Sequence, residues 1–597
     1  MSANVSVSGP AGGGLDGVNA TVHGNGTDDV ASPPLTALGL LQNADFVMLE
    51  LKLLVGAMGI IYLGAHGALR RPPSASPSKP KEEGEDDEDE DDRFSQGLEL
   101  TDAIMFPLMA GAILAGLYYL IQWLKDPAIL NKILRWYMST VSIASLLSLY
   151  AHGMEVATSF VFPRYWRGPD GALRKVDQKA RLVARCDEVG NVVEGAPPES
   201  GLFPRLPVVR ALEGRVKSAA WDLRALLTRR WVFKLFIHGL VGEHKARVKF
   251  AHMMAFLLAT ATALVYFSTS SPLLSNMLGY GMCYGSFLIL SPTDFLIGSL
   301  VLVGLFFYDI YMVFFTPYMV TVATTLDVPI KLAFEAGARK SILGLGDIVI
   351  PGMVIGWALR LDLWIHYLRR VKYEPTDLKI LEKDVSSGRL TTRSEMKHRE
   401  VKAPYVNAKA KWGEKFWTRG RLFLSRPASV PLDLAATVFP KTYFYASMAG
   451  YLAGMLCTLA MLVVFNQGQP ALLYLVPGVL GSLVVTALVR GEMKDMWTYT
   501  EDGSLDTVDV VVDVDAEGRA IRTIGKLENG VVDTTKGKDG AKEDDEADKT
   551  EADKTEAVKA EADKAGRDAT RKGAKGKKNH AVFLLSLEAP SDDDEYE

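Results

Sequence analysis

The sequence is poor in cysteine. Its 597 residues contain only Cys186, Cys283 and Cys457, and two of these lie in apolar stretches. This number and spacing predict neither a disulfide framework nor a cysteine-based metal centre. The N-terminus also lacks a basic segment followed by a short apolar core, so we expect no cleavable signal peptide. The first apolar segment would then act as its own insertion signal.

The chain also lacks a strong net charge. The formal value of −5 averages acidic and basic segments, so it gives no reason to expect nucleic acid as a partner. Apolar residues, in contrast, make up 48% of the chain. They gather in runs of membrane-spanning length between charged blocks, which predicts an all-α, multi-pass membrane protein whose partner is the lipid bilayer.

We expect nine transmembrane helices. Their approximate positions are 46–69, 102–124, 136–162, 250–268, 273–290, 294–315, 341–359, 443–465 and 470–489. Two basic insertions, 163–249 and 366–441, separate three groups of spans at 46–162, 250–365 and 442–490. With a lumenal N-terminus, nine spans place both insertions in the cytosol, in agreement with the positive-inside rule.

The two tails are polar, and we expect both to be disordered. Residues 1–45 hold three glycosylation sequons, at Asn4, Asn19 and Asn25, and no other sequon occurs in the chain. Their clustering predicts that this tail is lumenal and glycosylated. The tail 491–597 would be cytosolic, and the acidic segment 72–99 would be a solvated linker. A hairpin within residues 506–533 is compatible with their alternating pattern.

Other polar or amphipathic features have plain structural interpretations. The stretch 211–240 looks amphipathic, either as a helix on an anionic membrane surface or as an ordinary packed helix. His66 and His252 fit helix-end or packing positions. His152 and Glu155 share a helix face, but no third ligand accompanies them, so we expect an interfacial pair. We therefore predict no metal site and no cofactor.

Two apolar stretches each carry one aspartate. Asp309 lies deep within 294–315, and Asp347 follows Gly344-Leu345-Gly346 within 341–359. An ionisable group at membrane depth costs roughly 2.5–3.5 kcal/mol on insertion scales, so it usually faces a cavity or a partner. The partner that we expect for each aspartate is the other. Two carboxylates in one desolvated site do not both ionise easily, so one keeps a proton, as an aspartyl dyad requires.

Three short motifs accompany this pair, and each alone is a weak signal. Tyr308-Asp309 alone fits an interhelical hydrogen bond, and the glycines before Asp347 fit tight helix packing or close approach of a substrate backbone. Pro470-Ala471-Leu472 fits an ordinary helix start, although proline can also keep the chain from covering a site.

Together and in this order, the three motifs resemble the signal peptide peptidase family of presenilin-type intramembrane aspartyl proteases. The resemblance extends to GLFFYDIYMVFFTPYMVTVA, DVPIKLAF, LGLGDIVIPG, KTYFYASMAGYLAG and QPALLYLVPGVLG, and it covers most of 276–365 and 441–499. It implies the nine-helix fold, Asp309 and Asp347 as the catalytic pair, and an active site shaped by Tyr308, Gly344, Leu345, Gly346, Pro470, Ala471 and Leu472.

The same resemblance implies cleavage of membrane-spanning helices, including remnant signal peptides and type II proteins, in the endoplasmic reticulum. Met312 stands where the family often has tryptophan, both insertions are large, and the final residues, SDDDEYE, are not a dilysine signal. The sequence leaves a homo-oligomer open. Two other functions also remain open: a transporter or cation channel that uses both aspartates as an ion site, and a non-catalytic chaperone that binds helices.

Overall fold

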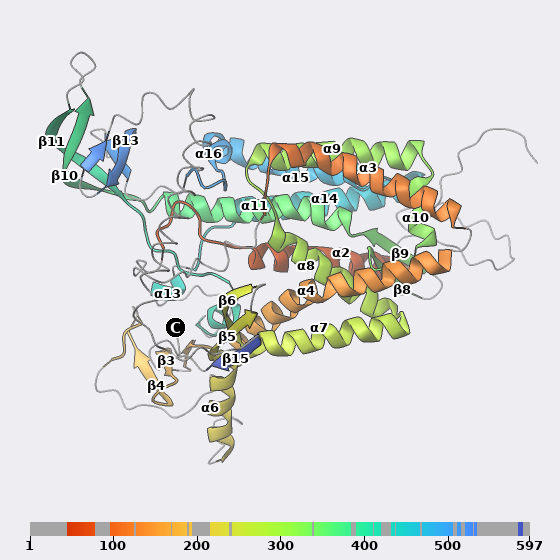
Figure 1. Cartoon of the computed structure of the whole chain (residues 1–597), viewed down its shortest axis with the longest axis horizontal. Helices are drawn as coiled ribbons and strands as arrows, with labels where there is room; N and C mark the ends of the chain where they lie inside the picture. Colours follow the sequence, from red (N-terminus) through yellow and green to blue (C-terminus); the bar gives the residue numbers. More distant parts are fainter. Residues whose placement is uncertain are drawn as a thin grey trace, which may run out of the picture.

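The computed structural model shows a mostly helical protein (Figure 1). The residues that it describes are 44–77, 96–124, 127–193 without 169, 188 and 189, 215–237, 241–418 without 327, 337, 338, 384–389 and 410, 432–465 without 436, 469–505, 510–514, 520–528, 531–533 and 583–588. The sequons at Asn4, Asn19 and Asn25 lie outside this part, as do most of the acidic segment and of the C-terminal tail.

Among the described residues, nine long helices form the bundle: α2 (Ala44–Gly67), α3 (Leu100–Trp123), α4 (Pro127–Val161), α7 (Phe250–Thr269), α8 (Pro272–Ile289), α9 (Phe295–Phe315), α11 (Gly346–Leu368), α14 (Thr442–Phe465) and α15 (Leu472–Arg490). Shorter helices are α6 (Arg215–Thr228), α10 (Tyr318–Thr325), α12 (Trp412–Thr418), α13 (Leu432–Ala435) and α16 (Met493–Thr498).

Strands occur mainly outside the bundle. They are β1 (Gln96–Leu98), β2 (Tyr165–Arg167), β3 (Leu173–Asp177), β4 (Leu182–Cys186), β5 (Arg230–Ile237), β6 (Val241–Lys249), β7 (Leu290–Pro292), β8 (Lys331–Ala336), β9 (Arg339–Gly344), β10 (Lys372–Lys383), β11 (Leu390–Val401), β12 (Val510–Val514), β13 (Ala520–Glu528), β14 (Val531–Asp533) and β15 (Phe583–Glu588). The sheets are β1-β7, β2-β3-β4, β15-β5-β6, β8-β9 and a closed β10-β11-β12-β13-β14 barrel.

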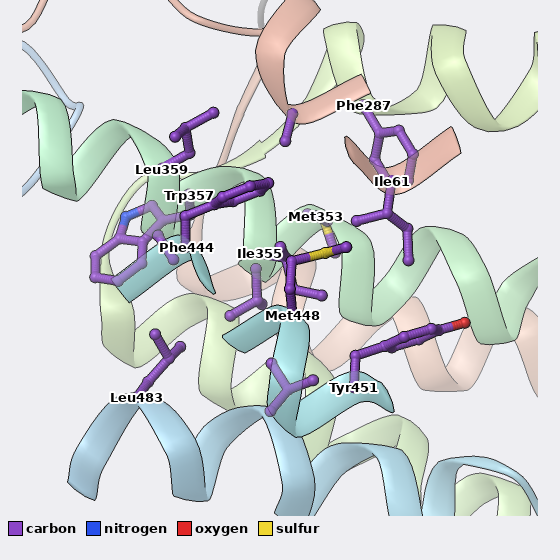
Figure 2. Packing of buried hydrophobic residues seen from close by; sticks show 14 of the residues in the cluster. Ile61, Phe287, Met353, Ile355, Trp357, Leu359, Phe444, Met448, Tyr451 and Leu483 are labelled. Atoms are coloured by element: carbon purple, nitrogen blue, oxygen red, sulfur yellow. The ribbon is translucent and has the colours of Figure 1, made fainter. Parts of the chain in front are cut away.

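Helix α11 lies at the centre of the bundle, in contact with α2, α8, α9, α14 and α15 (Figure 1). It is the most enclosed of the apolar helices, with 89% of its most apolar window buried. Figure 2 shows Met353, Ile355, Trp357 and Leu359 of α11 among side chains from the surrounding helices. A helix that is apolar all round and buried all round is stabilised mainly by this packing, so it offers a fixed support for the residues at its ends.

Seven helices are long and apolar enough to cross a membrane within the part of the chain that the structure describes: α2, α3, α7, α9, α11, α14 and α15. The predicted third and fifth spans correspond to α4, which has 35 residues, and to α8, which has 18. Neither is among the seven. The chain is therefore a multi-pass membrane protein, while the count of nine stays a prediction.

Two predicted helices extend over residues that form strands. The predicted seventh span starts at residue 341, but residues 341–344 lie in β9 and the helix begins at Gly346. Glycine is a poor helix former, and β9 pairs with β8 instead, from Lys331↔Gly344 to Ala336↔Arg339. The expected amphipathic helix over 211–240 also ends early, because α6 stops at Thr228 and β5 follows it, paired with both β6 and β15.

The prediction of a disordered tail after residue 490 is wrong for its first part. Helix α16 follows α15 directly, and Met496 and Tyr499 are fully buried against the bundle. The Tyr499 ring packs on Trp357 and Trp364 of α11, at centroid distances of 5.5 and 5.1 Å. The hairpin compatible with 506–533 does form, as β12 and β13.

Candidate active site

Asp309 lies on α9, and its side chain is buried, with 3% of the residue exposed. The helix around it is almost entirely apolar, and Asp294 caps its start by accepting a 2.7 Å hydrogen bond from the Ile297 amide. A carboxylate within such a helix has no reason to be there unless it meets a polar partner. The structure supplies one polar group from another helix.

That group is the backbone amide of Leu472, which donates a hydrogen bond to Oδ2 of Asp309 at 3.0 Å. Helix α15 begins at Leu472, and Gln469 and Pro470 before it are not helical. The amides of a helix's first turn have no partner within the helix. The Leu472 amide is therefore free to reach Asp309. Pro470 helps to keep it free, because proline is poorly accommodated in a helix interior and so disfavours an earlier helix start.

Asp347 lies in the first turn of α11, immediately after the β8–β9 hairpin. The Leu345 amide donates to the Ile330 carbonyl at 3.1 Å, which ties the turn to the residue that precedes β8. The carbonyl of Leu345 then accepts from Ile348 and Val349 at 3.1 and 2.9 Å and starts the helix. A strand-to-helix turn with glycine on both sides of Leu345 thus fixes where the carboxylate sits.

Gly344 gives the Asp347 carboxylate its space. A Cβ at this position would lie 3.2 Å from Oδ2 of Asp347, which is closer than ordinary van der Waals contact. Alanine here would push on the carboxylate itself. Gly346 has no such close neighbour, because a Cβ there would meet only Ile350, at 3.7 Å. Of the two glycines, Gly344 is the one that a side chain would disturb.

The three motifs come together through their helices. Helices α9, α11 and α15 pack on one another, and the Asp309 and Asp347 carboxylates lie close enough to interact electrostatically. Ala471 caps α15 beside them and accepts from the Leu475 amide at 3.1 Å. Tyr308 is the exception. Its hydroxyl donates to the Ala110 carbonyl of α3 at 3.5 Å. This is an interhelical hydrogen bond, which the motif alone also fits.

The close packing of α14 on α15 holds the Leu472 amide in place. A Cβ on Gly450 of α14 would lie 2.2 Å from the Gly478 carbonyl, so the two backbones touch where both residues are glycine. Small residues at such contacts permit the closest approach of two helices in a membrane. Any side chain at Gly450 would separate the helices and displace the start of α15.

Tyr451 is a site residue that the sequence does not reveal. It lies on α14, is fully buried, and donates from its hydroxyl to the Asp347 backbone carbonyl at 3.3 Å. Its only signal is a tyrosine in the middle of an apolar span, which by itself does not name its partner. Figure 2 shows the Tyr451 hydroxyl extending along α11.

Glu155, which shares a helix face with His152, has a charged partner from another element. Glu155 forms an ion pair with Lys249 at 2.7 Å, next to the first residue of α7. Within the part that the structure describes, no group of three or more histidine, cysteine, aspartate or glutamate side chains could hold a metal ion. In that same part, no lysine, arginine or histidine forms an ion pair with Asp309 or Asp347.

Comparison with known proteins gives a consistent result. The sequence model of the signal peptide peptidase family matches residues 89–503. A probable intramembrane protease of Saccharomyces cerevisiae is 26% identical over 467 residues, which is 74% of this chain and 66% of that protein. Another from Schizosaccharomyces pombe is 30% identical, covering 44% of this chain and 69% of that protein.

The signal peptide peptidase of Mus musculus is also 30% identical, over 39% of this chain and 45% of that protein. The chain thus spans between 45 and 69% of the length of these three relatives. No solved structure shows a significant match to it.

Proposed function

The chain belongs to the signal peptide peptidase family, and from this premise we propose that it is an intramembrane aspartyl endopeptidase with Asp309 and Asp347 as its catalytic pair. One observation carries the proposal: the buried Asp309 of α9 and the half-buried Asp347 of α11 have carboxylates close enough to interact electrostatically. Such a pair is what acid–base hydrolysis of a peptide bond needs.

In the proposed reaction, one carboxylate accepts a proton from water while the water oxygen attacks the carbonyl carbon of the substrate. The protonated partner donates its proton to the carbonyl oxygen, which gives a neutral tetrahedral intermediate. When the carbon–nitrogen bond breaks, the leaving nitrogen takes the proton held by the carboxyl group that had deprotonated the water. One hydroxyl of the intermediate gives its proton to the other carboxylate as it becomes the carbonyl of the product acid. The pair returns to one proton shared between two carboxylates. The Leu472 amide orients Asp309 throughout, because its hydrogen bond does not depend on the substrate.

The proposed substrates are membrane-spanning helices, including signal peptides and type II membrane proteins. A helix hides its carbonyls in internal hydrogen bonds, so it must unwind locally before attack. The non-helical residues before Leu472 suit an extended segment beside the carboxylates. Backbone groups there could pair with the unwound segment as an added strand and offset part of the unwinding cost.

The test is cleavage of a signal-peptide-like helix by the purified protein in detergent. We expect turnover by the unmodified chain, and a loss of at least about 10²-fold in Asp309→Asn and in Asp347→Asn, because an amide cannot exchange the required proton. Both variants should keep their expression and their unfolding temperature. Substantial turnover by either variant would refute the assignment. Binding of the helix without cleavage by the unmodified chain would favour the non-catalytic chaperone.

We also propose nine spans, with α4 and α8 in addition to the seven apolar helices, and a lumenal N-terminus in the endoplasmic reticulum. The basic insertions and the sequons at Asn4, Asn19 and Asn25 support this orientation. Glycosidase should lower the mass of the full chain, and replacing the three asparagines together should abolish that change. If protease added to intact microsomes trimmed the N-terminal tail and spared residues 366–441, the proposed orientation would be reversed.

A further inference from the structure

A basic cavity lies at the end of α11 that is far from Asp347. Its volume is about 140 Å³, and the ends of three helices line it: the last turn of α11, the start of α14 and the last residue of α15. Its charged and polar lining groups are Asp362, His366, Arg369, Arg370, Tyr443, Arg490 and Glu492. This volume is well below the roughly 300–1,000 Å³ of a pocket for a drug-sized ligand, so the cavity suits a small charged group.

The two acidic groups of the cavity already have partners. Asp362 accepts the amides of Thr442, Tyr443 and Phe444 at 2.9–3.2 Å. Glu492 forms ion pairs with Arg369 and, at 2.7 Å, with Arg490. These carboxylates are saturated with donors, so neither is available to a cation that enters the cavity.

Several donors, in contrast, remain unused. Arg370 is exposed, and its guanidinium makes no hydrogen bond or ion pair within the described part of the chain. Nε2 of His366 is buried and has no hydrogen-bond partner there. Arg369 and Arg490 share the Glu492 carboxylate, and Arg490 also donates to the Thr442 hydroxyl at 3.4 Å. Both guanidinium groups keep further N–H groups that have no acceptor among the described residues. Three guanidinium groups and an imidazole around one small cavity form a site for an anion with several oxygens.

We propose that this cavity binds the phosphate of an anionic phospholipid. Val485, Leu488 and Val489, which lie in the last turns of α15 before Arg490, are 59, 62 and 82% exposed. An exposed apolar face that ends at a cluster of arginines matches an acyl chain below a headgroup phosphate. Basic pockets between helix ends are recognised sites for such lipids at cytosolic surfaces. The leaflet follows from the proposed topology, whereas the binding chemistry does not depend on it.

The experiment measures thermal unfolding of the full chain in detergent with three probes: short-chain phosphatidic acid, short-chain phosphatidylcholine and inorganic phosphate. We expect phosphatidic acid alone to raise the unfolding temperature at low concentration. Arg370→Gln should weaken this binding about fivefold, which corresponds to about 1 kcal/mol per arginine near a membrane surface. Arg181→Gln is the control, because Arg181 is an exposed arginine that pairs with Asp222 of α6 and does not line the cavity.

Glu492→Gln separates lipid binding by the arginines from a purely structural role of these residues. Removing this carboxylate frees Arg369 and Arg490, so phosphatidic acid should bind more tightly although the unliganded variant is less stable. An equal effect of phosphatidylcholine, or an unchanged affinity in Arg370→Gln, would overturn the proposal. An equal effect of inorganic phosphate would overturn the lipid as the source of the phosphate. Asp347→Asn should bind the lipid normally, which separates this test from that of the protease.

Discussion

The carboxylates near the two ends of α11 differ in the number of hydrogen-bond donors around them. Asp347 lies in its first turn, and Asp362 lies 15 residues later, about 22 Å away along the helix axis. Asp362 accepts three backbone amides. Asp309, the neighbour of Asp347, accepts one. A carboxylate with all its donors in place is structural, whereas one with unused lone pairs is free to accept and release a proton.

Glu501 is the extreme case of a saturated carboxylate. It pairs with Arg70 of the chain after α2 and with Arg360 of α11, the latter at 2.7 Å, and accepts the Tyr499 hydroxyl at 2.5 Å. Ser291 bridges the group by donating to Glu501 at 2.9 Å and accepting from Arg360 at 2.6 Å. The side chains of Arg360 and Glu501 are only 4 and 5% exposed. This network joins four segments of the chain that are distant in sequence.

The largest effect should come from breaking this network. Glu501→Gln leaves the buried Arg360 without a counter-charge, and such a change costs about 3–5 kcal/mol. We expect the unfolding temperature in detergent to fall strongly. Asp502→Asn, one residue further on and exposed, is the control and should change little. Asp347→Asn should do the opposite of Glu501→Gln, with unfolding unchanged and turnover lost. If Glu501→Gln unfolded like the unmodified chain, the distinction between the two kinds of carboxylate would not hold.

The second effect is the response to acid. Burial alone would raise the pKa of Glu501, but the charges of Arg360 and Arg70 and the Tyr499 hydroxyl lower it from 4.5 to about 2. This difference contributes roughly 3 kcal/mol, fully present above pH 4.5 and lost as the pH falls toward 2. We expect the unfolding temperature of the unmodified chain to drop more steeply over this range than that of Glu501→Gln. Parallel profiles would contradict the lowered pKa.

A smaller effect is expected from Asp362→Asn. The asparagine side chain has one acceptor oxygen for three amide donors at the start of α14, and it no longer carries a charge that favours this end of a helix. A loss of about 2 kcal/mol in stability is expected, because hydrogen bonds to charged groups contribute about 1.5–3 kcal/mol. Turnover at a temperature where the variant stays folded should be unchanged. A loss of turnover there would mean that the two ends of α11 are coupled.

The smallest effect concerns the single donor of Asp309. Pro470→Ala permits α15 to extend backward, so that the Leu472 amide donates to the carbonyl four residues before it and leaves Asp309. We expect about a tenfold loss of turnover, which corresponds to about 1.4 kcal/mol. Leu472→Ala keeps the amide and loses only packing, so it should do less.

Comparing a helical substrate with one that carries a helix-breaking residue sharpens this last prediction. The extended α15 would also cover the site, so Pro470→Ala should lose proportionally less activity on the broken substrate. Equal losses on both substrates, or none, would mean that Pro470 is only a helix start.

The sequence predicts the parts of the site that depend on local composition. A single aspartate in a long apolar stretch marks α9, and Gly-Leu-Gly-Asp marks the turn before α11. It does not predict the donor of Asp309, because an unpaired amide at a helix start looks the same whether it meets water or a carboxylate. The β8–β9 hairpin also escaped prediction, because the sequence joins it to the apolar helix that follows it.

Glu501 shows the same limit more clearly. In the sequence it is one acid in a polar segment, which is typical of a solvated tail. Its structural role comes from Arg70 and Arg360, which are 431 and 141 residues away in the chain. Long-range pairing of this kind depends on how the helices pack and leaves no local pattern. The sequence therefore predicts a disordered tail, although the first part of that tail, with Met496 and Tyr499, packs against the bundle.

The position of Glu501 decides where this chain can be shortened. Removing everything after Arg490 would leave Arg360 without the Glu501 carboxylate. It would also remove the Tyr499 ring, which packs on Trp357 of α11. Ending the chain just after residue 505 would keep the Glu501 ion pairs and the Tyr499 ring. It would remove β12–β15, so β11 and β5 in the insertions would lose the strands that pair with them. A carboxy-terminal tag or a fluorescent fusion should thus be attached beyond residue 505. A protease that cuts the chain before Glu501 would detach the segment that connects Arg70 to Arg360.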